Sequence, residues 1–253
     1  MSIVKILPKS ADTAAALHDA RQEHLSGWTR GGLDLSDRFP SEIRSVAART
    51  EILTEGDFSD GMVIVRRGWM MQYRILEDGR RQVLQFGLPG DVIGYRADPA
   101  APLSFSVEAV TECEFAFVPF SIARRILRQG GRDAQRLFET LSLSLDSAFD
   151  ALTDAGRRNA LEAVAHFIWR TSRRIESGSD EETVAEFDFP LNQEQIGDLL
   201  GLTAVHVCRT LCKLKSLGVV SLCRGKLRVE DPAALAEIAG ICETHPDEWS
   251  IAG

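Results

Sequence analysis

The chain has 253 residues, of which 44% are hydrophobic and 26% charged, and its formal net charge is −8. These values are typical of an ordinary globular protein, and the length suits two small domains better than one compact core. No run of about 18 consecutive apolar residues occurs, so a membrane-spanning helix is excluded.

The N-terminal stretch MSIVKILPKSADTAAALHDARQ has only a short apolar run, which a lysine interrupts. It lacks the long hydrophobic core and the small-residue cleavage pattern of a signal peptide. We therefore expect a cytoplasmic protein with no membrane partner, in which residues 1–25 form a helical segment. The five cysteines have irregular spacing and match neither a disulfide framework nor a paired zinc site, so we expect reduced thiols and no metal.

Residues 26–120 are expected to form a β-roll, because short apolar runs alternate with glycines from Arg49 to Val118. Apolar and polar residues alternate in QYRIL and QVLQF, on either side of Asp78 and Gly79. This pattern predicts a hairpin whose two turn residues both have positive φ. Several such strands close together predict a double-stranded, cupin-like jelly roll with the size of a sensor domain.

Residues 121–156 are expected to form one long helix. Its apolar residues recur at alternating steps of four and three, namely Ala134, Phe138, Leu141, Leu145, Ala148, Leu152 and Ala155. This heptad spacing indicates packing against a second helix, and therefore a homodimer. The predicted interface residues are Phe138, Leu141, Leu145, Ala148 and Leu152. A helix that lies on its own domain can show a similar stripe, so this alternative stays open.

Residues 157–253 are expected to form a winged helix-turn-helix domain. Asn192 and Gln195 match a capping box at the start of a helix that runs to about Leu200. Gly201 allows a sharp turn after it, and Thr203 can cap a second helix. The segment VVSLCRGKLRVE then predicts two short strands, which form a wing, before a final short helix.

The second helix of this unit has one outward edge. Residues placed at 100° intervals put Val207, Leu211 and Leu214 on a buried arc, with Val205 and Arg209 on the opposite side. In a DNA major groove, an arginine can donate two hydrogen bonds to guanine, and a small apolar side chain can contact the methyl group of thymine. Taken alone, an exposed valine and a solvated arginine are also what an ordinary surface helix shows.

The net negative charge of the whole chain hides a basic region near the C-terminus. Between Leu199 and Val229, six basic residues occur without any acidic residue. The cations on the predicted wing can meet phosphates beside the groove. The residues predicted to bind DNA are Thr203, Ala204, Val205, His206, Cys208, Arg209, Lys213, Arg224, Lys226 and Arg228.

Two other classes of function were compared with DNA binding. One is a ligand-binding signalling subunit whose C-terminal helices dock a protein, but such helices have no need for phosphate-directed cations. The other is an enzyme, which we do not expect because the motifs G-x-S-x-G, H-E-x-x-H and G-x-x-x-x-G-K-[ST] are absent from the sequence.

With these features the sequence resembles the Crp/Fnr superfamily of bacterial transcription regulators, from about residue 28 to 240. Its most specific part is QEQIGDLLGLTAVHVCRTLCKLKSLGVV. The resemblance implies a homodimer that reads a near-palindromic operator in double-stranded DNA, with RNA polymerase as a further partner. Arg209 matches the base-contacting arginine of the family, whereas Val205 stands where many members carry glutamate.

The resemblance does not identify the signal. Members that bind cyclic AMP present an arginine and a serine to the phosphate and a glutamate to the ribose. The corresponding positions of the possible effector cassette are Leu103, Ser104 and Tyr95. A phosphate would be buried without a cation opposite it, which argues against cyclic AMP.

No cofactor is predicted. The first cysteine is Cys113, whereas the iron–sulfur members need several cysteines near the N-terminus. His18 and His24 are the only N-terminal histidines that could ligate a haem, and we do not expect that role. Cys208 lies beside the DNA-facing edge, where its oxidation could block docking as a redox switch, although a cysteine can also be simply a small helix residue.

Overall fold

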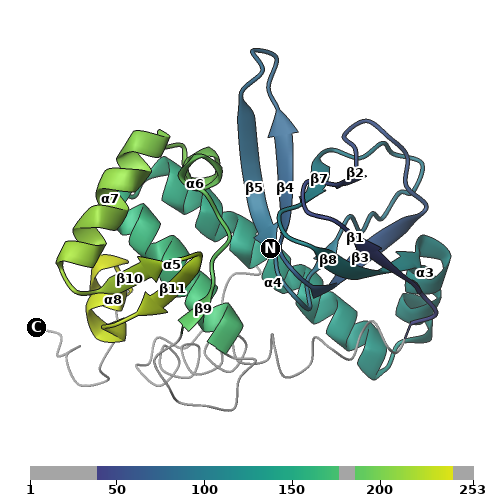
Figure 1. Cartoon of the computed structure of the whole chain (residues 1–253). Coiled ribbons are helices and arrows are strands. Elements are labelled where there is room, and N and C mark those ends of the chain that lie inside the picture. The colour runs from purple at the N-terminus through teal and green to yellow at the C-terminus, as the bar shows by residue number, and fades with distance from the viewer. Residues whose placement is uncertain (1–38, 177–185, 242–253) are drawn as a thin grey trace, which may run out of the picture.

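The computed structural model describes residues 39–176 and 186–241, so the predicted segment 1–25 lies outside the described residues. The N-terminal part consists of two four-stranded antiparallel sheets, with strand orders β1-β8-β3-β6 and β2-β7-β4-β5 (Figure 1). Its strands are β1 (Glu42–Val46), β2 (Glu51–Leu53), β3 (Gly61–Arg67), β4 (Met70–Ile75), β5 (Arg81–Gly87), β6 (Val92–Ile93), β7 (Ser106–Ala109) and β8 (Cys113–Pro119). The predicted double-stranded β-roll is therefore confirmed.

The hairpin between β4 and β5 forms where it was predicted, but its turn is different. Gly79 has a φ of 82°, whereas Asp78 does not have a positive φ. The N–H of Gly79 donates to the carbonyl of Leu76 (2.9 Å), and the N–H of Leu76 donates to the carbonyl of Arg80 (2.8 Å). The loop is thus a three-residue turn with a single left-handed glycine. The Asp78 carboxylate stabilises it by accepting from the N–H of Arg80 at 3.0 Å.

The segment predicted as one helix over residues 121–156 is two helices. They are α3 (Phe120–Gln129) and α4 (Arg132–Gly156). Gly130 and Gly131 separate them, with φ values of 68° and 83°. Glycine adopts these angles without steric cost, and they end a right-handed helix. The apolar residues with heptad spacing, from Ala134 to Ala155, all lie on α4 and are called the seam below.

One face of α4 is buried and the other carries the seam. Leu137 and Ala151 face the core of the chain itself. The exposed apolar side chains on α4 are those of Phe138, Leu145, Ala148, Phe149, Leu152 and Ala155. Leu141 differs from the other predicted interface residues, because it is half-buried and packs against the β-roll. Apart from Leu141, the predicted interface residues are exposed.

The C-terminal part combines helices with a three-stranded antiparallel sheet of order β10-β11-β9. Its elements are α5 (Ala160–Glu176), β9 (Glu186–Asp188), α6 (Gln193–Leu200), α7 (Ala204–Ser216), β10 (Val220–Cys223), β11 (Lys226–Val229) and α8 (Pro232–Ile238). This is the predicted winged helix-turn-helix arrangement. No helix in the part of the chain that the structure describes has the length and apolarity that a membrane crossing requires.

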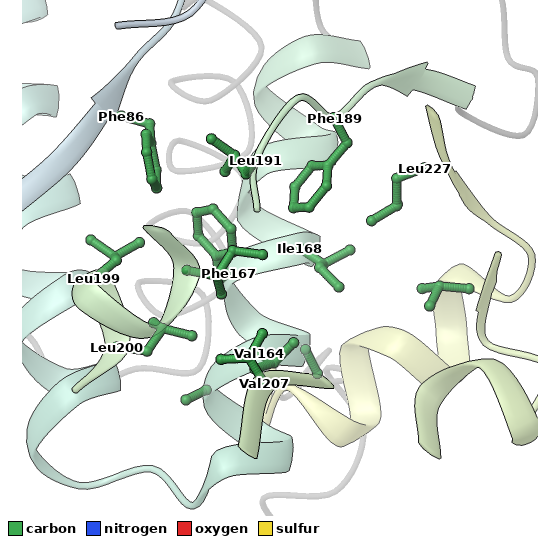
Figure 2. Close-up of a cluster of buried hydrophobic side chains, with 14 of the residues drawn as sticks. Phe86, Val164, Phe167, Ile168, Phe189, Leu191, Leu199, Leu200, Val207 and Leu227 are labelled. Atoms are coloured by element: carbon green, nitrogen blue, oxygen red, sulfur yellow. The ribbon is translucent and has the colours of Figure 1, made fainter. Parts of the chain in front are cut away.

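A single apolar core joins the β-roll to the C-terminal part. Trp69 and Phe86 of the β-roll are in the same buried cluster as Phe167 of α5 and Phe189, which follows β9. The ring centroids of Trp69 and Phe189 are 6.1 Å apart, and those of Phe86 and Phe167 are 5.9 Å apart. Figure 2 shows Phe86 on one side of the boundary, opposite Phe167 and Phe189. Burial of large aromatic side chains therefore fixes the two parts against each other.

Two ion pairs reinforce this boundary. The Nη2 atom of Arg174 on α5 lies 2.7 and 2.6 Å from the two carboxylate oxygens of Asp91, which also accepts from the N–H of Leu88 at 2.8 Å. Asp91 is 3% exposed. Burial raises the pKa of Asp91, and the Arg174 charge opposes that rise. The second pair joins Arg81 of β5 to Asp198 of α6 at 2.8 Å.

Replacing Arg174 with alanine should lower the free energy of unfolding by about 3–5 kcal/mol, because Asp91 would stay buried without its cation. The measurement is urea unfolding at neutral pH. Since burial raises the pKa of Asp91, the loss should shrink as the pH falls and the carboxylate takes up a proton.

Arg67→Ala is the matched control for that measurement. Arg67 pairs with Glu112 at 2.8 Å, but the two side chains are 68% and 71% exposed. Removal of such a surface pair should cost less than about 1 kcal/mol. Equal losses for Arg174→Ala and Arg67→Ala would show that the Asp91 pair is worth no more than a surface pair.

Candidate nucleic-acid interface

Helix α6 begins with the capping box that the sequence predicted. The side-chain oxygen of Asn192 accepts from the N–H of Gln195 at 2.8 Å, and the Gln195 side-chain oxygen accepts from the N–H of Asn192 at 3.0 Å. The helix ends at Gly201, whose φ of 67° and ψ of 28° are left-handed. Both ends of α6 are therefore set by local sequence.

The turn between α6 and α7 is tight. The N–H of Leu202 donates to the carbonyl of Gly197 at 3.0 Å. Thr203 caps α7, and its hydroxyl oxygen accepts from the N–H of His206 at 3.3 Å. The predicted glycine bend and threonine cap are both confirmed. Together they fix the direction in which α7 leaves the turn.

Gly197 is a residue that the sequence reasoning missed. A Cβ atom at this position would lie 2.4 Å from the carbonyl oxygen of Leu202, so no side chain fits. The sequence signal that could have found it is an isolated glycine inside a helical pattern, which often marks a close backbone approach.

Helix α7 has a buried face and an outward face. Val207 and Leu214 are fully buried, as predicted, while Leu211 is only half-buried and Thr210 is buried in addition. Figure 2 shows Val207 pointing into the apolar cluster beside Val164 of α5. Cys208 lies half-buried beside the outward face. The residues of that face are all exposed, namely Ala204, Val205, His206, Arg209, Cys212, Lys213 and Ser216.

The wing forms around Arg224 and Gly225, which have φ values of 52° and 76°. Two residues with positive φ make the tight turn that suits a two-residue hairpin. All three wing cations, Arg224, Lys226 and Arg228, are exposed. The wing thus carries three exposed cations, one in its turn and two on β11.

The basic region is not free of acidic residues in space, although it is in sequence. Lys226 Nζ lies 3.7 Å from Asp188 and 4.0 Å from Glu186, both on the neighbouring strand β9. Arg228 Nε lies 3.5 Å from Glu230. The stretch from Leu199 to Val229 does not include these carboxylates, because Glu230 directly follows it and Glu186 and Asp188 come from strand β9, which pairs with β11.

Two of the three residues in the possible effector cassette lie together. Tyr95 and Ser104 line an open pocket of about 250 Å³, and Leu103 does not line it because its side chain is buried in the β-roll core. The pocket also contains a cation and an anion, Arg96 and Asp98, which the cassette comparison did not identify. Tyr95 packs edge-on against Phe120 at 6.4 Å.

The cysteines do not form a metal or disulfide site within the described residues. Cys113 is buried, Cys208 is half-buried, and Cys212 and Cys223 are exposed, all as free thiols. Among the described residues, no group of three or more histidine, cysteine or acidic side chains could hold a metal ion. The haem candidates His18 and His24 lie outside the described ranges.

Comparison with known proteins gives consistent matches. Residues 43–129 match the cyclic nucleotide-binding domain family, and residues 162–238 match the Crp-like helix-turn-helix domain family. The nitrogen fixation regulation protein FixK of Bradyrhizobium diazoefficiens is 34% identical over 191 residues, covering 74% of this chain and 78% of FixK. The transcriptional activatory protein AadR of Rhodopseudomonas palustris is 32% identical over 209 residues, covering 80% and 83%.

The fold is also similar to a solved structure, that of FixK2 from Bradyrhizobium japonicum. The TM-score is 0.69 at 27% sequence identity, and the match covers 78% of this chain and 96% of FixK2. The matched region of this chain therefore has the same architecture as nearly the whole of FixK2.

Replacing Gly197 with alanine should disrupt the helix-turn-helix unit, because the new Cβ atom would clash with the Leu202 carbonyl. We expect a loss of stability of about 1–3 kcal/mol from the forced backbone shift. Gly156→Ala is the control, since a Cβ atom on that helical glycine meets nothing within 4 Å. It should be neutral or stabilising by up to about 1 kcal/mol. Thermal unfolding measures both, and an unaffected Gly197→Ala variant would contradict the close approach.

Proposed function

Because the chain belongs to the Crp/Fnr superfamily of transcription regulators, we propose that it binds an operator as a homodimer. In this proposal each copy inserts α7 into the major groove of one half of a near-palindromic site. As a member of this family the chain is a regulator of transcription and not an enzyme.

The observation that carries this proposal is the outward face of α7. The helix is held by Val207 and Leu214, both fully buried, while Val205 is 57% exposed and Arg209 is exposed. A helix of about 10–12 Å diameter fits a major groove that is about 12 Å wide. Arg209 can then donate to the O6 and N7 atoms of a guanine.

The wing supplies contacts that do not depend on base sequence. Arg224 at its tip and Lys213 on α7 are exposed and can approach phosphates on either side of the groove. Lys226 and Arg228 are within 4.0 Å of carboxylates, but these pairs are at the surface. Exposed pairs are weak, so a phosphate can replace the carboxylate partner.

The dimer is proposed to form through the exposed seam of α4. Phe138, Leu145 and Leu152 are 68%, 55% and 70% exposed, and they lie on one face. An apolar stripe of this kind is stabilised when a second copy of the helix covers it. Two copies would then present their α7 helices to half-sites roughly 34 Å apart on DNA.

RNA polymerase is the further partner that we propose. The relative AadR is named a transcriptional activatory protein, and an activator acts through the polymerase. The β-roll is the part proposed to receive a signal.

Replacing Arg209 with alanine should weaken binding to a specific operator by about 1–3 kcal/mol and relax the preference at one base pair. Lys226→Ala is the comparison, and it should weaken binding to all sequences similarly. The operator is first selected from a random duplex pool, and the dissociation constants are then measured at one fixed salt concentration. Equal losses for Arg209→Ala on the selected and on random duplexes would contradict base reading.

Replacing both Leu145 and Leu152 with glutamate should convert the dimer to a monomer, because like charges would face each other across the seam. Sedimentation velocity measures the change. The control is Phe58→Glu, since Phe58 is 71% exposed but belongs to the loop between β2 and β3 and not to α4. A dimer that persists in the double variant would disprove the α4 interface.

A further inference from the structure

Val205 is a large apolar residue in the first turn of α7, and it is 57% exposed on the outward face beside the small Ala204 and the polar His206 and Arg209. We propose that Val205 makes the operator preference depend on the C5-methyl group of a pyrimidine. Each half-site then requires thymine at one position, and 5-methylcytosine can replace thymine there. This inference rests on the DNA-binding function proposed above and names the chemical group that one residue reads.

The position of the Val205 side chain is fixed by its neighbours. The Thr203 hydroxyl caps the turn in which Val205 lies, and Val207 is anchored in the core at 0% exposure. Because valine is branched at Cβ, one rotamer dominates in a helix. The side chain therefore presents its two methyl groups with little loss of conformational freedom on binding.

The distance from Val205 to Arg209 sets which base pair is read. Four helical residues span about 6 Å along the axis, and successive base pairs are about 3.4 Å apart. Val205 therefore reaches a base pair one or two steps from the guanine that Arg209 contacts.

The chemistry of the groove selects the methyl group. The only apolar group on a base edge in the major groove is the C5-methyl of thymine. Valine can neither donate nor accept a hydrogen bond, so a cytosine amino group placed against it would lose water without gaining a partner. The first turn of α7 contains no acidic residue that could accept from that amino group. A 5-methylcytosine carries the same methyl at the same ring atom.

The test removes single methyl groups from the DNA. The full chain is titrated with its selected operator, in which each thymine is replaced in turn by deoxyuridine in one or both half-sites. Burial of one methyl predicts a loss of about fourfold for one half-site and about fifteenfold for both, at one position only. At that position, the protein should bind an operator with 5-methylcytosine more tightly than one with cytosine, by a similar factor.

Two variants connect this effect to Val205. Val205→Ala should reduce the discrimination between the thymine and uracil operators, because the two γ-methyl groups that make most of the apolar contact are removed. Leu217→Ala is the matched control: Leu217 is 56% exposed, against 57% for Val205, and lies at the other end of α7. It should keep the full discrimination between thymine and uracil.

The outcomes separate this inference from the proposed function. If no thymine shows the loss, or if Val205→Ala keeps it, the methyl reading is overturned while operator binding stands. A protein that selects no sequence at all would overturn the proposed function instead, and the methyl reading with it.

Discussion

The packing of α5 against both the β-roll and α7 is the constraint on which the rest of the molecule depends. Phe167 on α5 contacts Phe86 of the β-roll, and Val164 and Ile168 on the same helix are buried in one cluster with Val207 of α7. Figure 2 shows this cluster continuing from one part of the chain into the other. Because the interior is close-packed, α7 cannot turn relative to the β-roll without moving α5. The outward face of α7 therefore has a defined orientation.

The end of α4 is tied to α5 by charges as well. Asp154, whose side chain is fully buried, lies 2.8 Å from the Nδ1 atom of His166 and 2.5 Å from Arg158. Arg170 of α5 lies 3.8 Å from the same carboxylate and donates to the carbonyl of Ser147 at 3.0 Å. Burial lowers the pKa of Arg170, and the Asp154 charge opposes that shift. Buried charges tolerate few alternative arrangements, so this cluster fixes the angle between the α4 seam and the domain that carries α7.

Local signals allowed the recognition unit to be predicted from sequence, and long-range contacts account for what was missed. The cap at Thr203, the bend at Gly201 and the wing turn at Arg224 each depend on residues a few positions apart. In contrast, the need for glycine at Gly197 arises from the approach of Leu202 after the chain has turned, and the carboxylates beside Lys226 come from another strand. The joint core of the two parts has no periodic signature, because its members come from strands, a loop and helices far apart in sequence.

The two faces of α7 separate folding from recognition. Val207 and Leu214 are fully buried, so changes there alter the packing of the domain. Val205 and Arg209 are exposed, and exposed positions on a helix contribute little to stability. Substitutions at Val205 and Arg209 can therefore change which bases are favoured while α5, the turn and the wing keep α7 in place. A regulator built in this way can acquire a new operator through its outward edge alone, without any change in the core that joins the β-roll to the DNA-binding helices.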